Sequence, residues 1–460
     1  MSENSAPTKV ANEYERERIP DAELKGSGKF WGMYSGEHAA GTEFMIGPLF
    51  LLSGVSLYNI FLGLLVGNLL AVFSWRFVCA PIATQARWTL YYHLEKIAGK
   101  KLVKIYNLAN GVLFCFLAGA MITVSATAVG IPFNLEMPAF DAIYPSSVSF
   151  VVIVLLVGGV ISAVASVGYD AVSKFANIAA PWMVLVFFAC GVVALKQLGV
   201  SSWAELQAIW TDSIQFAQGG EVTTSMGFFE VMLFAWFCNS AMHVGMSDLS
   251  VFRFAKKASS GWATIGGMYV GHYMAWIAAA FMLAAQIKLT QSADPVPGPM
   301  AFNVVGIAGI ICVVVAGWTT ANPTIYRAGL AFQAMLPSAS RLSMTLLAGG
   351  IATVAAVFPA FAFKLLGFVG LYGTILAPMG AVIYVDWYFS KRVGITPFYA
   401  ENSGSSVNKA VLFAWVLPVA VALYFIFAQG ATTWYFVLPA WLACGVLFLV
   451  FSRARGAQRV

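Results

Sequence analysis

The sequence predicts an all-α membrane protein with twelve transmembrane helices, and its composition carries most of that prediction. Hydrophobic residues make up 60% of the 460 residues and charged residues only 10%, against about 25% charged in an ordinary soluble domain. The mean hydropathy is +0.79. A water-soluble fold has too little interior to hide this much apolar surface. We therefore expect a multi-pass protein of the plasma (inner) membrane.

Twelve stretches are long and apolar enough to cross a bilayer, which takes about 20 residues. The connections between them are short, so we expect one membrane domain, 30–452, without soluble modules. The expected crossings are 30–55, 58–79, 105–130, 147–167, 171–195, 225–247, 262–286, 300–326, 342–360, 363–386, 408–428 and 433–452.

The positions of Lys and Arg predict the orientation of these crossings. If the amino terminus is cytosolic and the crossings alternate, only Lys196, Lys288 and Lys364 of the 26 Lys and Arg residues face outward. This is the bias that the positive-inside rule describes. We therefore expect both termini in the cytosol, with 1–29 and 453–460 as tails. Topology then accounts for the net charge of +6 without a nucleic-acid partner.

Two crossings that lie five apart share a polar pattern. "WGMYSGEHAAGTE", from Trp31 to Glu43, follows W-x3-S-x2-H-x4-E, and "WFCNSAMHVGMSD", from Trp236 to Asp248, repeats it with a final Asp. Crossings five apart run in opposite directions, so the pattern indicates an inverted repeat of five plus five helices. The halves would be 30–195 and 225–386, followed by two extra helices in 408–452. A chance match over four positions is the alternative.

The glycines and polar residues of these two crossings predict breaks in their helices. A broken helix exposes backbone groups that are tolerated in a bilayer only where they line a cavity or hold a ligand. Amino-terminal ends of half-helices favour electron-rich groups, and unwound carbonyls suit a small cation. We therefore expect a central site between the two breaks. Its candidate side chains are Glu37, His38, Glu43, Asn239, Ser240 and His243.

The eighth crossing is interrupted by the segment "GWTTANPTIYRAGLAF". Thr319 and Thr320 place two hydroxyls side by side in an apolar helix, unless they only bond carbonyls of their own helix. Asn322 can donate and accept hydrogen bonds, so it suits a ligand amide or ring edge, or it caps the helix. We expect Pro323 to bend or end the helix. We expect Arg327 to reach the cytosolic boundary.

Four motifs recur in order along the chain. "GPLFLLSGVSLYNIFLGLLVGN" follows the first crossing, "DLSVFRFAKK" the sixth, "TTANPTIYRAGLAFQ" lies in the eighth, and "APMGAVIYVDWYF" ends the tenth. Together they resemble the nucleobase:cation symporter family 1, which includes purine, cytosine, allantoin and hydantoin permeases. The resemblance implies a LeuT-like fold with a site between helices one, three, six and eight. It also implies import of a small nitrogenous heterocycle with Na+ or H+ by alternating access.

The resemblance further implies a sodium site. Its two hydroxyls correspond to Thr319 and Thr320, and backbone carbonyls of the first break, from Ala39 to Thr42, would complete it. No cofactor is implied beyond Na+ or H+ as the coupling ion. A carboxylate at Glu43 near this site would let a proton replace sodium.

The chain departs from the family where the substrate is expected. Some members hold the heterocycle between tryptophans of helices three and six. Helix three here has no Trp, which makes Phe114 the candidate for stacking. On helix six, counting back from Asp248 puts Asn239 at the stacking position, and counting back from Arg253 puts Ala241 there. Glu37 and His38 suit an N–H-rich or cationic ligand. An amino-acid or amine symporter of the same fold is therefore the alternative.

Other function classes lack their signatures in the sequence. There is no H-E-x-x-H motif and no nucleophile with a neighbouring base, so we do not expect an enzyme. There is no repeated filter motif or charged ring, which disfavours a channel. His272 in the seventh crossing is interpreted as structural. The expected partners are a small-molecule substrate and the lipid bilayer, and the oligomeric state is left open.

Overall fold

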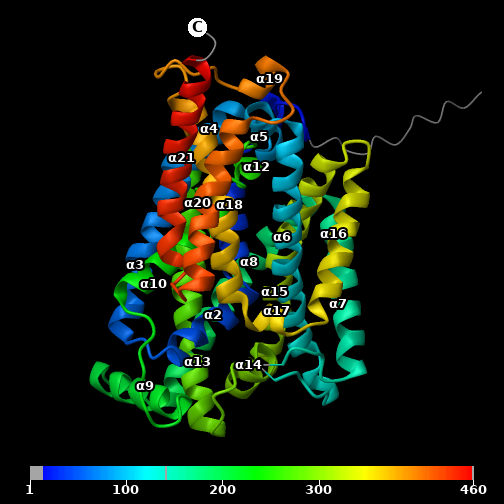
Figure 1. Ribbon diagram of the computed structural model, residues 1–460. Helices are drawn as coiled ribbons and strands as arrows, with labels where there is room; N and C mark the ends of the chain where they lie inside the picture. The colour runs from blue at the N-terminus through cyan, green and yellow to red at the C-terminus, as the bar shows by residue number, and fades with distance from the viewer. Residues whose placement is uncertain (1–13, 140–141, 458–460) are drawn as a thin grey trace, which may run out of the picture.

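The computed structural model describes residues 14–139 and 142–457. These residues fold almost entirely into helices, and a parallel bridge joins Lys25 to Ala255. The long helices run side by side in one bundle (Figure 1). The first half of the chain forms α1 Gly28–His38, α2 Gly41–Leu52, α3 Leu57–Ser74, α4 Ala80–Ala86, α5 Leu90–Ala98, α6 Lys100–Val129, α7 Val148–Val167, α8 Tyr169–Leu198, α9 Trp203–Ala217, α10 Phe228–Phe237, α11 Ser240–His243 and α12 Leu249–Phe252. The second half forms α13 Met274–Thr290, α14 Pro297–Val305, α15 Ile307–Met335, α16 Arg341–Ala356, α17 Ala360–Phe363, α18 Leu365–Tyr388, α19 Tyr399–Ser403, α20 Lys409–Ala428 and α21 Trp434–Ala457.

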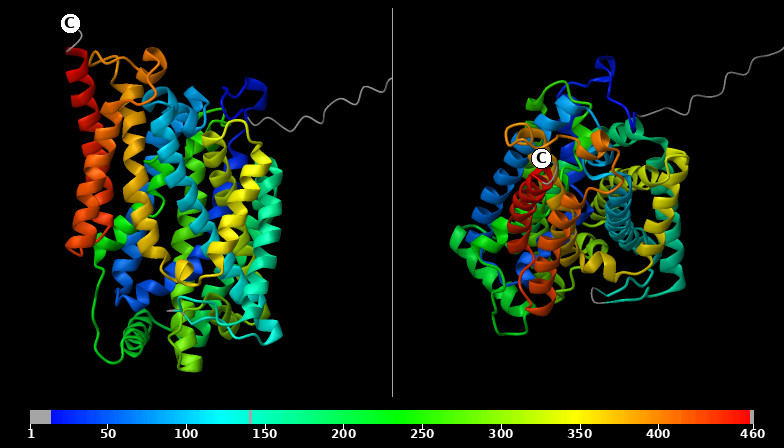
Figure 2. Two further views of the ribbon diagram at one scale, coloured as in Figure 1. Left: turned by 45° about the vertical axis from the view of Figure 1, so that its right-hand side comes forward. Right: turned by 45° about the horizontal axis from the view of Figure 1, so that its top comes forward.

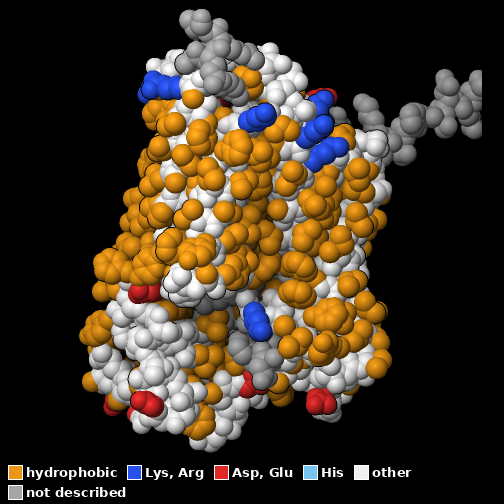
Figure 3. Space-filling view, viewed as in Figure 1, with side chains coloured by type: hydrophobic (Ala, Val, Ile, Leu, Met, Phe, Trp, Pro, Cys, Tyr) orange, Lys and Arg blue, Asp and Glu red, His pale blue; other side chains and the backbone are white. Residues whose placement is uncertain are grey.

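The helices account for the twelve expected crossings. Nine helices of the described residues are long and apolar enough to span a membrane. Shorter apolar helices form the other three: α1 with α2, α10 with α11 and α12, and α16. Hydrophobic side chains cover most of the face shown in Figure 3 between the two ends of the bundle, as expected for a surface that faces lipid. The chain is therefore a multi-pass membrane protein.

The first crossing is broken for two residues. Ala39 and Ala40 leave the helical region with φ, ψ of −102°, 70° and −131°, −179°. Directly after them, α2 begins against α15, where a Cβ added at Gly41 would lie 3.0 Å from the Gly317 Cα. Small residues on both sides therefore let the unwound backbone approach the eighth crossing closely.

The sixth crossing is broken twice. Asn239 interrupts it between α10 and α11, and Met246 adopts a left-handed φ of 65° before α12. The neighbouring α18 approaches this region closely, since a Cβ at Gly380 would lie 1.8 Å from the Val244 carbonyl oxygen. Both crossings that share the polar pattern are therefore broken near that pattern.

The second and seventh crossings each contain a π-helical stretch. It covers Trp75–Cys79 between α3 and α4, and Gly266–Tyr273 directly before α13. A π turn adds a residue to the helical repeat and so changes which side chains face a neighbour; such turns are frequent at functional sites. Both stretches lie beside the broken crossings, since α3 packs on α10 and the seventh crossing packs on α1 and α2.

The eighth crossing differs from its expected bounds of 300–326. The stretch 297–305 forms the separate α14, and Gly306, with a φ of 63°, separates it from α15. The long helix then continues through Pro323 to Met335. Of the two outcomes expected for Pro323, an end of the helix is wrong: the missing N–H costs one intrahelical bond, and α15 is packed against α6 and α16.

Residues near both ends of the described chain lie at the same end of the bundle, beside α19 (Figures 1 and 2). The opposite end carries α9 and α14 (Figure 1). On the face shown in Figure 3, Lys and Arg side chains gather toward the α19 end and acidic side chains toward the other. This arrangement agrees with an even number of crossings.

Candidate functional site

A central cavity lies between the two broken crossings. It is small, with about 50 Å³ open to water-sized molecules, and is lined by residues of α1, α2, α6, α11, α13, α15 and α18, with Cys238 and Asn239 from the sixth-crossing break and His272 from the π-helical stretch before α13. Five of the residues predicted from the sequence line it: Glu37, His38, Thr42, Asn239 and Thr320. The breaks therefore bring together polar groups from the first, sixth and eighth crossings.

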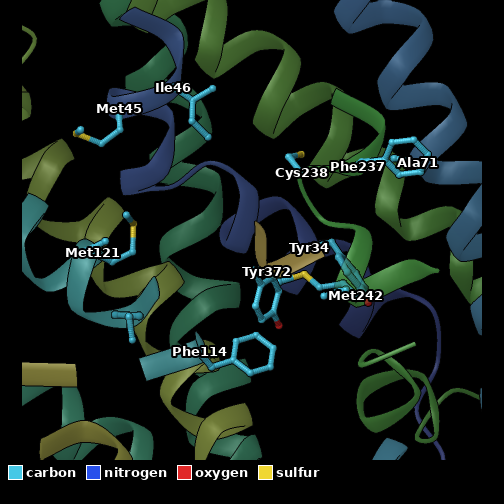
Figure 4. Packing of buried hydrophobic residues seen from close by; sticks show 14 of the residues in the cluster. Tyr34, Met45, Ile46, Ala71, Phe114, Met121, Phe237, Cys238, Met242 and Tyr372 are labelled. Carbon is cyan, nitrogen blue, oxygen red and sulfur yellow. The ribbon is translucent and has the colours of Figure 1, made fainter. Parts of the chain in front are cut away.

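The aromatic wall of the cavity differs from the predicted one. Tyr372 of α18 and Trp276 of α13 line it. Phe114, the predicted stacking residue on α6, is fully buried behind Tyr372, with ring centroids 5.3 Å apart in an edge-on arrangement (Figure 4). The structure thus places Phe114 one residue away from the cavity, as a support for Tyr372.

An ion cluster lies at the α19-side end of the cavity. The guanidinium of Arg327 donates to both oxygens of Glu37, the second at 3.2 Å, and to Asp248 Oδ1 at 3.1 Å. Arg327 is only 3% exposed. The expectation that it reaches the cytosolic boundary is wrong, because the carboxylates of both broken crossings hold it inside and α15 continues for two turns beyond it.

Further side chains fix this cluster in place. Asp248 Oδ2 accepts from the Tyr34 hydroxyl at 2.6 Å and from the Trp75 indole N–H at 2.7 Å. The Tyr91 hydroxyl donates to the Arg327 carbonyl at 3.3 Å. The cluster therefore connects α1, the π turn of the second crossing, the start of α12 and α15. Together these elements close the cavity at its α19-side end.

A second buried carboxylate lies on the opposite side of the first break. Glu43 Oε2 accepts from the Trp276 indole N–H at 2.5 Å, and its Oε1 lies 3.7 Å from His272 Nε2. The His272 ring is 4.7 Å from the His38 ring. His272, which the sequence analysis interpreted as structural, therefore lines the cavity and links these two candidate residues.

The two threonines of the predicted sodium site face different partners. The Thr319 hydroxyl donates to the Ala316 carbonyl of its own helix at 2.9 Å. The Thr320 hydroxyl lies 3.4 Å from the Ala316 carbonyl and 3.4 Å from the carbonyl of Glu37, in the last turn of α1. Thr320 therefore brings α15 into contact with the break where Ala39 is unwound.

Three other candidates lie outside the cavity lining. Asn322 is fully buried, and neither atom of its amide group has a hydrogen-bond partner among the described residues. His243 donates from Nε2 to the Trp236 carbonyl at 2.9 Å, and the Ser240 hydroxyl lacks a described partner.

Sequence reasoning missed the tyrosine and tryptophans that bind the acids. Tyr34, Trp75 and Trp276 are common residue types in membrane helices, and their polar atoms give no signal in a single sequence. One indication was present: Tyr34 lies one turn before His38, inside the repeated polar pattern. Trp75 and Trp276 lie outside the repeated pattern. The π turns of the second and seventh crossings determine their positions, and these turns cannot be identified from the sequence.

Comparisons with known proteins show the fold. No protein-family model and no curated protein matches the chain. Among solved structures, it resembles Mhp1, a nucleobase-cation-symport-1 family transporter, in a closed conformation with bromovinylhydantoin bound (14% identity, 96% of this chain and 95% of that chain, TM-score 0.73). It also resembles Mhp1 in an inward-facing conformation (14% identity, 98% and 96%, TM-score 0.73). A third similar structure is a Na+-coupled sialic acid symporter in a substrate-bound outward-open state (12% identity, 96% and 92%, TM-score 0.66).

These similarities extend over nearly the whole of each chain. They confirm the predicted fold class: an all-helical membrane protein with the LeuT-like arrangement of two inverted five-helix repeats and two further helices. At identities of 12% to 14%, the conclusion that they carry is the fold.

Proposed function

We propose that the protein is a secondary active symporter, an atypical relative of the nucleobase-cation-symport-1 transporters, which imports a small nitrogenous heterocycle with Na+. The observation that carries this proposal is the contact of Thr320 with the broken first crossing, at the edge of the central cavity. Hydroxyl and carbonyl oxygens that converge on a helix break suit a small cation. An ion bound there would order the same backbone that shapes the substrate cavity.

The polar groups of the cavity support a substrate with both N–H and C=O groups. Glu37 lines the cavity and its carboxylate accepts from Arg327, and His38 Nε2 lacks a hydrogen-bond partner among the described residues. The Asn239 amide N–H2 also lacks one and can donate to a ligand carbonyl. Trp276 and Tyr372 supply aromatic faces for a planar ring. The bromovinylhydantoin bound to Mhp1 belongs to this chemical class.

The charge of the site disfavours an anionic substrate and favours a cationic one. Arg327 faces two carboxylates, Glu37 and Asp248, so the cluster has an excess negative charge when all three groups are ionised. An anionic substrate would add to that charge in a medium of low dielectric constant. An amine or amino-acid symporter is therefore the second candidate, since a ligand ammonium would be attracted to Glu37.

Alternating access would operate through the two closures of the cavity. The Arg327 cluster closes the side on which both ends of the described chain lie, and we place this side in the cytosol on the basis of the Lys and Arg distribution. Opening toward that side requires α1 and α12 to separate from α15, which breaks the bonds of Arg327 to Glu37 and Asp248. Binding of the ion and the substrate would supply the free energy for this opening.

Replacing Thr320 with Ala tests the sodium assignment. We expect Na+-dependent uptake of a hydantoin or nucleobase probe into proteoliposomes to fall at least about tenfold, equivalent to ~1.4 kcal/mol. Thermal stabilisation of the purified protein by Na+ should fall in parallel. Thr353→Ala is the matched control, because Thr353 is a buried threonine that bonds its own helix at the Gly349 carbonyl.

Two outcomes would contradict the proposal. Full uptake in sodium-free buffer that is unchanged in Thr320→Ala would remove the sodium site. A screen in which amines, and no nitrogenous heterocycle, stabilise the wild-type protein would replace the proposed substrate by the second candidate.

A further inference from the structure

Four exposed lysines gather where α6 and α20 begin. Lys100, Lys101 and Lys104 stand in the first two turns of α6, and Lys409 is the first residue of α20; we call these four residues the lysine cluster. The two helix starts lie together, because the Lys101 N–H donates to the carbonyl of Ser406, just before α20, at 3.0 Å. Figure 3 shows basic side chains at this end of the face on which α6 and α20 lie.

An apolar strip continues from the lysine cluster along both helices. The helices stay in contact further along, since the rings of Tyr106 and Trp415 lie 5.7 Å apart. Beside these rings, the side chains of Ile105 and Leu108 on α6 and of Phe413 on α20 are exposed. Exposed apolar side chains on membrane-spanning helices face the acyl chains of the bilayer. The lysine cluster therefore stands where the headgroups of one leaflet meet its acyl chains.

The acids near the lysine cluster are already neutralised. A surface hollow beside Lys100 has about 480 Å³ open to water-sized molecules, and the acids that line it are Glu95 and Glu401. Glu95 forms an ion pair with Arg16, and Glu401 forms one with Lys96. In the part of the chain that the structure describes, none of the four lysines of the cluster forms an ion pair.

Without an anion, this arrangement of lysines is unfavourable. The amino-terminal end of a helix carries a positive partial charge and favours acidic groups, yet α6 begins with Lys100 and no side chain caps it. Lys100 and Lys104 are four residues apart on one helix face, so their like charges repel. The positive-inside rule accounts for lysines on this side of the membrane. It does not account for their grouping at two adjacent helix starts, which an anion between them would stabilise.

We propose that the lysine cluster binds the headgroup of an anionic phospholipid in the leaflet on the α19 side, which we expect to be cytosolic. The phosphate lies between the starts of α6 and α20, and the acyl chains follow the apolar strip. The hollow beside Lys100 holds the polar part of the headgroup. Groups of lysines directly beside membrane-spanning helices are suited to anionic lipids. The inference goes beyond the proposed symporter function and does not depend on it.

Native mass spectrometry tests the site without a substrate. The purified protein in detergent is titrated with phosphatidylglycerol or with zwitterionic phosphatidylcholine, and the forms that carry one lipid are counted. Lys100→Gln combined with Lys104→Gln should weaken binding of the first phosphatidylglycerol at least about tenfold, since each lysine near an anionic headgroup contributes roughly fivefold. Binding of phosphatidylcholine should be the same in both proteins.

Two matched double variants control for charge. Lys100→Arg with Lys104→Arg keeps the positive charges and should bind phosphatidylglycerol like wild type. Lys256→Gln with Lys257→Gln removes two exposed charges that follow α12, away from the lysine cluster, and should leave the affinity unchanged. Equal weakening by the two glutamine pairs would mean that net charge alone attracts the lipid and would overturn the proposal. Unchanged binding in the Lys100 and Lys104 glutamine variant would overturn it as well.

A thermal-unfolding series separates the phospholipid from free phosphate. Wild type should be stabilised by phosphatidylglycerol and not by inorganic phosphate at the same concentration, because only the lipid has acyl chains to cover the apolar strip. Leu108→Gln, within that strip, should reduce the stabilisation by phosphatidylglycerol. Equal stabilisation by inorganic phosphate would replace the lipid by a free anion and contradict the proposal. None of these measurements requires transport, so their outcome is independent of the proposed function.

Discussion

Arg327 shows why a single residue in a membrane must be judged with its partners. A lone arginine in an apolar helix is expected to extend toward water. Here two carboxylates, 79 and 290 residues away in sequence, satisfy it inside the protein. Removal of one partner from such a buried set leaves an uncompensated charge, which is more destabilising than replacement of the whole set.

The first prediction concerns this cluster. Arg327→Met keeps an unbranched, flexible side chain but leaves Glu37 and Asp248 buried without their cation, so we expect a loss of about 3–5 kcal/mol in stability. Adding Glu37→Gln and Asp248→Asn to the same protein should recover most of that loss. Thermal unfolding in detergent measures both. Arg453→Met, at an exposed arginine, is the control. Equal stability of the Arg327 and Arg453 variants would show that the cluster is not stabilising.

At the scale of elements, sequence patterns located the broken helices better than the continuous ones. The breaks in the first and sixth crossings could be predicted because glycines and polar residues interrupt an apolar run. The length of α15 could not, since Pro323 and Arg327 are tolerated only through packing and charges from other helices. The π turns that place Trp75 and His272 at the acids also left no mark in residue type.

The short helix α5 offers a prediction outside the membrane-spanning segments. His93 is buried between the rings of Trp88, Trp387 and Phe398. Burial, with the charge of Lys96 as a smaller cause, lowers the pKa of His93 from 6.5 to about 3. Between these two pH values, His93 therefore binds a proton in the unfolded chain but not in the folded state. The stabilisation is complete above pH 6.5 and is lost as the pH falls toward about 3.

Replacement of His93 by Phe should remove this sensitivity while keeping an aromatic ring in the same space. We expect wild type to lose stability on acidification with a slope of up to about 1.4 kcal/mol per pH unit from this residue. His93→Phe should show a correspondingly flatter profile. Unfolding midpoints measured below pH 6.5 make the comparison. Parallel profiles for the two proteins would mean that His93 is already protonated in the folded state.

At the scale of the whole molecule, composition and charge were enough to predict the architecture. Three features can be identified in the sequence without knowing how the helices pack: the apolar runs, their even number, and the polar pattern repeated five crossings apart. The cavity was harder to predict, because six crossings contribute side chains to it and the position of each side chain depends on the rotation of its helix. Thus Glu37 and Thr320 were expected at the cavity and line it, whereas Tyr372 entered its wall in the place expected for Phe114.

The orientation in the membrane is the last prediction, and the protein is well suited to test it. All six cysteines are buried, so the native chain should react little with a membrane-impermeant maleimide. Thr211 on α9 and Ser403 on α19 are exposed and lie at opposite ends of the bundle (Figure 1). With both termini cytosolic, Thr211→Cys should be labelled in intact cells and Ser403→Cys only after permeabilisation. The reverse pattern would place the Arg327 closure on the outer side of the membrane, and the ion cluster would then close the cavity against the outside.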